Sequence, residues 1–201
     1  MTIPNIITIS RIILVPFIAV ALLINTHFSV WMACGLFIIG SFTDFLDGYI
    51  ARKLNQTSEF GAFLDPIADK LLVGSVLVII CAKYNTLWLT IPTCVIIMRE
   101  LFISALREWG AKVNLEKSIK VSMTGKIKTA VQMISIGFLI AGYILESLHW
   151  VGVAALVGAA FLTIYSMIEY MVAFYGAMKQ RIKNTKSDTP LRTRLGAKYG
   201  V

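Results

Sequence analysis

Long apolar stretches recur along the whole of this sequence. Hydrophobic residues make up 57% of its 201 positions and charged residues only 15%, whereas a soluble domain is about half apolar and a quarter charged. A membrane-spanning helix needs about 20 predominantly apolar residues. The sequence therefore predicts an all-α integral membrane protein with six transmembrane helices, at residues 6–24, 30–51, 65–82, 87–106, 127–145 and 151–177.

Lysine and arginine are distributed unevenly between the two sides of the predicted spans. They gather around residues 52–60 and 107–126 and in the tail 179–201, whereas the loops on the other side contain only Lys83. Cytoplasmic loops of membrane proteins carry an excess of these residues, so we expect both termini to be cytoplasmic. This placement explains the net charge of +8 without nucleic acid as a partner.

The charge distribution also suggests how the chain is organised. We expect residues 1–178 to form the six-helix transmembrane domain and residues 179–201 to form a basic cytoplasmic tail. A basic residue near an anionic lipid surface gains about 1 kcal/mol of attraction. Two interpretations of the tail stay open: it binds anionic lipid headgroups, or it only fixes the topology.

Four of the five aspartates lie in one short stretch that joins the second and third predicted spans. Asp44 and Asp47 are three positions apart and Asp65 and Asp69 are four apart, so each pair shares one face of a helix. Ionisable residues in membrane segments are costly and mark functional sites. Glycines and alanines on the same faces leave room beside the carboxylates. The pattern predicts a cavity for a hard divalent cation such as Mg²⁺, Mn²⁺ or Ca²⁺.

The complete motif is Asp44-x2-Asp47-Gly48-x2-Ala51-Arg52-x8-Gly61-x3-Asp65-x3-Asp69. It resembles the signature of the CDP-alcohol phosphotransferase family, with every defining position filled. The resemblance implies six transmembrane helices, usually in a homodimer, and two Mg²⁺ ions, with Mn²⁺ as a substitute, at a cytosolic site. It also implies phospholipid biosynthesis in a bacterial-type inner membrane, by transfer of a phosphatidyl group from CDP-diacylglycerol to an alcohol with release of CMP.

The resemblance assigns roles to the aspartates by position. Asp44, Asp47 and Asp65 resemble ligands of the first metal ion. Asp44, Asp65 and Asp69 resemble ligands of the second, and Asp69 also resembles the general base that takes a proton from the alcohol.

The resemblance also suggests contacts with CDP-diacylglycerol. We expect the small residues of the motif to keep the site open and the polar residues to contact the nucleotide lipid. Each polar candidate has a simpler explanation as well, because an arginine can snorkel at a span end and an asparagine or threonine can cap a helix. The candidates are Gly48, Arg52, Ser58, Gly61, Thr8 and Asn5.

Residues 3–17, 99–111 and 125–133 resemble the phosphatidylglycerophosphate synthase branch of the family, which implies glycerol 3-phosphate as the acceptor. A dianionic phosphate is bound best by several converging lysines and arginines. Basic residues at a suitable depth support this interpretation. They are Arg99, Arg107, Lys120, Lys126 and Lys128.

Some features allow other interpretations. Arg99 and Glu100 are adjacent, so we expect them to point to different sides of a helix and not to pair. Gly152 and Gly158 are expected to serve helix packing or a dimer seam. Intramembrane acids also occur in cation transporters, and a metal-dependent lipid-binding protein without turnover is a further alternative. The same metal site could use inositol phosphate, phosphatidylglycerol or serine as acceptor.

Overall fold

The computed structural model describes residues 3–24, 26–54, 59–113 and 123–199, with side chains at 7–24, 26–43, 61, 63–113 and 127–183. These residues form six helices and no strand, which confirms the predicted all-α class. The helices are α1 (Ile3–Ile24), α2 (His27–Leu54), α3 (Glu59–Tyr84), α4 (Leu87–Lys112), α5 (Met123–Ala141) and α6 (Glu146–Tyr199).

Several helices are long and apolar enough to cross a membrane. In the described part of the chain, three segments meet both criteria: Ile7–Ile24, Leu87–Lys112 and Glu146–Lys183. Shorter apolar helices occur at His27–Thr43 and Ile127–Ala141. Large apolar side chains such as Phe17, Trp88 and Phe161 are exposed on the outside of the bundle. Extensive apolar surface of this kind fits a lipid environment, and the side of the membrane on which the termini lie stays a prediction.

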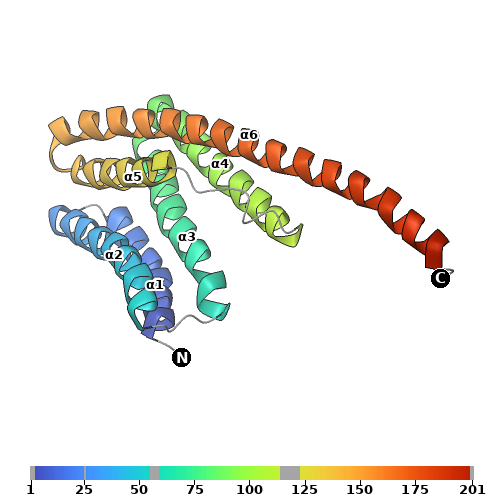
Figure 1. Cartoon of the computed structure of the whole chain (residues 1–201). Helices are drawn as coiled ribbons and strands as arrows, with labels where there is room; N and C mark the ends of the chain where they lie inside the picture. Colours follow the sequence, from blue (N-terminus) through green and yellow to red (C-terminus); the bar gives the residue numbers. More distant parts are fainter. Residues whose placement is uncertain (1–2, 25, 55–58, 114–122, 200–201) are drawn as a thin grey trace.

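The helices pack in two groups that meet along the middle of the molecule. Helix α1 packs against α2 and α3, while α6 packs against α5 and α4 (Figure 1). Fully buried side chains from both groups, among them Leu22, Leu72, Ile96 and Leu156, belong to one apolar core. This arrangement places the start of α1 near the end of α2 (Figure 1).

Most helices extend beyond the predicted spans by a few residues, and three differences in their ends affect the description of the site and the tail. Helix α3 begins at Glu59 instead of residue 65, so Asp65 and Asp69 lie within the helix and not at its start. Helix α5 ends at Ala141 instead of residue 145, and a turn follows at Gly142, where a Cβ atom would lie 2.8 Å from His149 Cα. Helix α6 continues through residue 178 to Tyr199 and extends past the other helices (Figure 1), so the proposed tail is helical.

Gly152 allows α5 and α6 to touch. A Cβ atom at this position would lie 2.8 Å from Leu139 Cγ and 2.9 Å from the Leu139 nitrogen. The Ser135 hydroxyl donates a hydrogen bond of 3.3 Å to the Gly152 carbonyl across the same contact. Gly152 therefore serves helix packing, as the sequence predicts, and the Gly158 Cβ position has no atom within 4 Å among those compared.

We expect Gly152→Ala to lower the melting temperature of the detergent-solubilised protein by about 2–12 °C, because overpacking a close contact costs about 1–3 kcal/mol. The matched variant Gly158→Ala adds the same methyl group where the chain leaves open space. Its melting temperature should stay within about 2 °C of the wild type. Equal melting of the two variants would contradict this description of the α5–α6 contact.

Candidate active site

Asp65 and Asp69 lie one turn apart in α3, on the side where α1 and the central cavity approach. Arg11 of α1 is completely buried, and its Nη1 lies 3.7 Å from Asp65 Oδ1. Thr8, one turn earlier in α1, is also buried. The packing of α1 on α3 therefore places the Arg11 guanidinium beside Asp65.

Other residues of the predicted metal and nucleotide sites can be placed only by their helices. Asp44, Asp47, Gly48 and Arg52 lie near the end of α2, Asn5 in the first turn of α1 and Lys126 in α5, and the side chains of all six are outside the described set. Ser58 and Lys120 lie outside the described residues altogether. Gly61 is half-buried near the start of α3.

The carboxylate oxygens of the described aspartates are of the type that binds a hard divalent cation. Asp65 and Asp69 supply carboxylate oxygens from one helix face, and such oxygens are the preferred ligands of Mg²⁺ and Ca²⁺. Among the described side chains no three His, Cys, Asp or Glu residues come together. The α2 pair Asp44 and Asp47 would add further carboxylate oxygens, which a site for two ions needs beyond those of the described pair.

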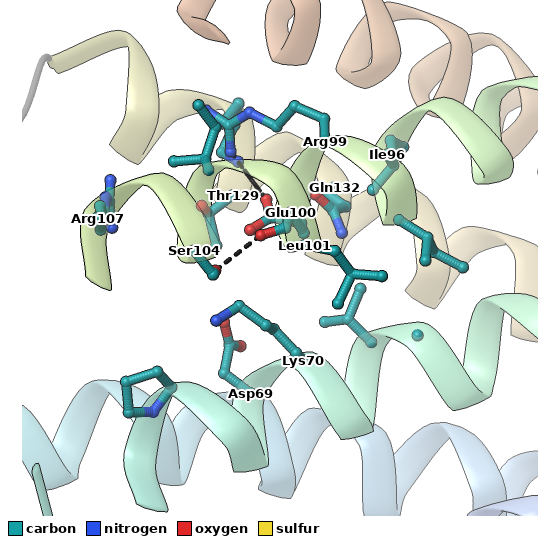
Figure 2. A pocket seen from close by; sticks show the side chains of 16 residues that line it. Asp69, Lys70, Ile96, Arg99, Glu100, Leu101, Ser104, Arg107, Thr129 and Gln132 are labelled. Atoms are coloured by element: carbon teal, nitrogen blue, oxygen red, sulfur yellow. Dashed lines mark hydrogen bonds and ion pairs between the residues drawn. The ribbon is translucent and has the colours of Figure 1, made fainter. Parts of the chain in front are cut away.

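A cavity of about 750 Å³ opens between α3, α4 and α5. Figure 2 shows Asp69 and Lys70 on α3 facing Arg99, Glu100 and Ser104 on α4 across this space. Thr129 and Gln132 contribute the α5 wall, and Arg107 lies farther along α4 (Figure 2). Four basic side chains line the cavity against two carboxylates, so the space favours an anion: Lys70, Arg99, Arg107 and Lys128 against Asp69 and Glu100.

Glu100 holds two of these cations. Its Oε1 accepts a hydrogen bond of 3.1 Å from Arg99 Nη1 and a second, short one from Lys128 Nζ. Arg99 and Lys128 are only 7% and 5% exposed. Because isolated buried charges are costly, the shared carboxylate is what allows two cations to approach one another here.

The expectation that Arg99 and Glu100 would not pair is therefore wrong. Adjacent positions separate the two Cβ atoms around the helix, but both side chains are long enough for their ends to converge. Lys128 of α5 attracts the Glu100 carboxylate toward the cavity, where the Arg99 guanidinium also lies. Helix periodicity predicts where a side chain starts and not where a long charged side chain ends.

Of the other nitrogen atoms of the Arg99 guanidinium, one has a hydrogen-bond partner in the described part of the chain and one has none. Nη2 donates a hydrogen bond of 2.8 Å to the Ser166 hydroxyl of α6. Nε is buried and has no hydrogen-bond partner among the described residues. A buried donor without a partner is rare and costly, and this one belongs to a residue that lines an anion-favouring cavity.

Sequence reasoning identified part of this arrangement. Arg99, Arg107 and Lys128, three of the predicted acceptor-phosphate residues, line one cavity, and their role stays a prediction. It missed Lys70, whose position directly after Asp69 of the motif was the available signal. The contact between Arg11 and Asp65 was not predicted.

Comparison with known proteins identifies the family. The family model of the CDP-alcohol phosphatidyltransferases matches residues 1–178. The chain belongs to this family. It is therefore a membrane-bound transferase, of a family that generally depends on divalent metal ions.

Curated relatives resemble the chain over most of its length. A protein of Haemophilus influenzae named CDP-diacylglycerol–glycerol-3-phosphate 3-phosphatidyltransferase is 43% identical over 90% of this chain and 97% of its own length. Proteins of the same name from Shigella flexneri and Escherichia coli are 40% and 39% identical, each over 85% of this chain and 93% of their own length.

Proposed function

We propose that this protein transfers the phosphatidyl group of CDP-diacylglycerol to a hydroxyl of glycerol 3-phosphate and releases CMP. The observation that carries the proposal is a cavity that Asp69 lines together with several basic side chains, among them Arg99 and Lys128. The names of the similar proteins support both substrates. The site faces the cytoplasm in the inner membrane of a bacterial-type cell, where the soluble acceptor and the lipid donor meet.

Asp69 is proposed to handle the proton of the reaction, and the four motif aspartates are proposed to hold the metal ions. Asp69 accepts the proton of the acceptor hydroxyl, as a positioned carboxylate can. The hydroxyl oxygen then bonds to the phosphorus that carries diacylglycerol, the bond from this phosphorus to the bridging oxygen breaks, and its electron pair leaves with CMP. Two Mg²⁺ ions, held by Asp44, Asp47, Asp65 and Asp69, would supply charge neutralisation for the diphosphate when bound.

The acceptor phosphate occupies the basic side of the cavity. Arg99 offers its buried Nε, and Lys128 and Arg107 add positive charge from α5 and from the cavity wall. A dianionic phosphate gains more from these groups than serine or a neutral polyol would. Lys120 and Lys126 are proposed to contribute further positive charge to phosphate binding.

The lipid donor occupies the part of the site formed by α1, α2 and the start of α3. Gly48, Arg52, Ser58 and Gly61 are proposed to contact its CDP moiety, with Thr8 and Asn5 alongside. Thr8 supports this placement because it is buried one turn from Arg11, which contacts Asp65. The protein is proposed to act as a homodimer, with the extension 179–201 near anionic lipids.

We expect Arg99→Ala to raise the KM for glycerol 3-phosphate by about 10- to 100-fold, because a hydrogen bond from a charged group contributes about 1.5–3 kcal/mol. The KM for CDP-diacylglycerol should change by less than about threefold, since Arg99 lines the acceptor side of the cavity. Steady-state kinetics of CMP release in mixed micelles measures both constants. Lys179→Ala removes an exposed cation from α6 and serves as the control. An equal rise of both KM values in Arg99→Ala would refute the acceptor site.

A further inference from the structure

Helix α6 contacts two of the cavity's arginines although no described α6 side chain lines the cavity itself. Arg99 Nη2 donates its hydrogen bond of 2.8 Å to Ser166 of α6. The Arg107 guanidinium carbon lies 5.6 Å from the centre of the Tyr170 ring, within the distance of a cation–π interaction. Ser166 and Tyr170 are four residues apart and thus share one face of α6.

The Ser166 hydroxyl is oriented to accept from Arg99. It donates its own hydrogen to the Thr163 carbonyl at 3.1 Å, one turn earlier in α6. Its lone pairs are then directed to the buried guanidinium, and Ser166 is only 5% exposed. The Arg99 guanidinium is therefore held by hydrogen bonds to Ser166 and to Glu100.

Tyr170, which contacts Arg107, is itself held in place by other aromatic side chains. Its ring packs on Phe174 with a centroid distance of 6.4 Å, and Phe174 packs on Trp109 of α4 at 5.3 Å. Gly110 lets Phe174 approach α4 closely, since a Cβ there would lie 3.2 Å from the Phe174 ring. The aromatic cluster thus fixes the register between α6 and the part of α4 that carries Arg107.

We propose that Ser166 and Tyr170 are positioning residues for the acceptor phosphate: they hold Arg99 and Arg107 in the conformations that bind it. The pair acts only through the two arginines, because Ser166 and Tyr170 are not among the residues that line the cavity. The inference rests on the proposed acceptor site. It implies that α6 contributes to acceptor binding, although the aspartate motif lies in α2 and α3.

Paired substitutions test the two positions separately. We expect Ser166→Ala to raise the KM for glycerol 3-phosphate about tenfold, whereas Ser166→Thr, which keeps a hydroxyl, should stay close to the wild type. Tyr170→Leu should raise it about two- to fivefold, because it removes the aromatic face. Tyr170→Phe retains that face and is the matched control. The KM for CDP-diacylglycerol should change by less than about twofold in all four variants.

A double-mutant cycle shows whether Ser166 acts through Arg99. Groups that form one contact give non-additive effects, so Ser166→Ala should have no further effect on acceptor KM in an Arg99→Ala background. Unchanged acceptor KM in Ser166→Ala and Tyr170→Leu, with a raised KM in Arg99→Ala, would overturn the positioning role and leave the acceptor site intact. Unchanged KM in Arg99→Ala as well would overturn the acceptor site together with the inference built on it.

Discussion

Asp69→Asn should reduce the rate of CMP release by at least about 100-fold while CDP-diacylglycerol still binds. General-base catalysis contributes about 10²- to 10⁴-fold, and an amide cannot take up the acceptor's proton at neutral pH. Asp69 is the one motif aspartate whose described side chain lines the basic cavity, so the acceptor hydroxyl is proposed to meet it there. The amount of CMP released, measured after the reaction is stopped, gives the turnover rate. Calorimetric titration in detergent measures binding of CDP-diacylglycerol.

The control for this substitution is Glu108→Gln. Glu108 is another carboxylate of the helical bundle, but it is exposed and pairs with Lys112 at 2.9 Å on the surface of α4. Exposed pairs contribute little, so this variant should keep nearly wild-type turnover. If Asp69→Asn retained more than about a tenth of the wild-type rate, Asp69 would not be the base.

Chelation of divalent ions should abolish turnover, and Mg²⁺ should restore it, with Mn²⁺ as a substitute. Asp65 and Asp69 lie one turn apart in α3, and a pyrophosphate substrate adds negative charge that a divalent ion would neutralise. A bound divalent ion also stabilises the folded protein, by about 2.7 kcal/mol at 100 times its dissociation constant. Mg²⁺ should therefore raise the melting temperature of the substrate-free protein.

The melting experiment separates metal binding from catalysis. Asp65→Asn combined with Asp69→Asn should remove the Mg²⁺-induced rise, because both of these proposed ligands lose their charge. Glu108→Gln should retain the rise. Full activity after exhaustive chelation would contradict the metal site, and a Mg²⁺-induced rise that persists in the double variant would place the ion elsewhere.

Hydropathy and charge spacing were sufficient to predict the helical architecture. Each of the six helices overlaps one predicted span, because membrane helices need long apolar runs that are visible in a sequence. The ends were predicted less well where the polar residues of a helix extend beyond its apolar part, as from Glu59 to Asp65 in α3. The turn at Gly142, where α5 has ended early, and its close approach to His149 give no hydropathy signal.

The candidate site was predictable wherever local spacing carries the chemistry. Asp65 and Asp69 follow from their separation of four residues, and the basic residues of α4 and α5 from their depth. The contacts of Arg11 with Asp65 and of Ser166 with Arg99 join residues far apart in the chain. A single sequence contains no signal for such pairs, because helix packing decides which faces meet.

The most direct measurement is CMP release by the purified protein with CDP-diacylglycerol and Mg²⁺, comparing glycerol 3-phosphate, serine, inositol phosphate and phosphatidylglycerol as acceptors. We predict release with glycerol 3-phosphate and, by mass spectrometry, a lipid product that contains both phosphates of phosphatidylglycerophosphate. Release with another acceptor and not with glycerol 3-phosphate would contradict the interpretation of the basic cavity. A protein that binds Mg²⁺ but releases no CMP with any acceptor would contradict the proposed reaction itself.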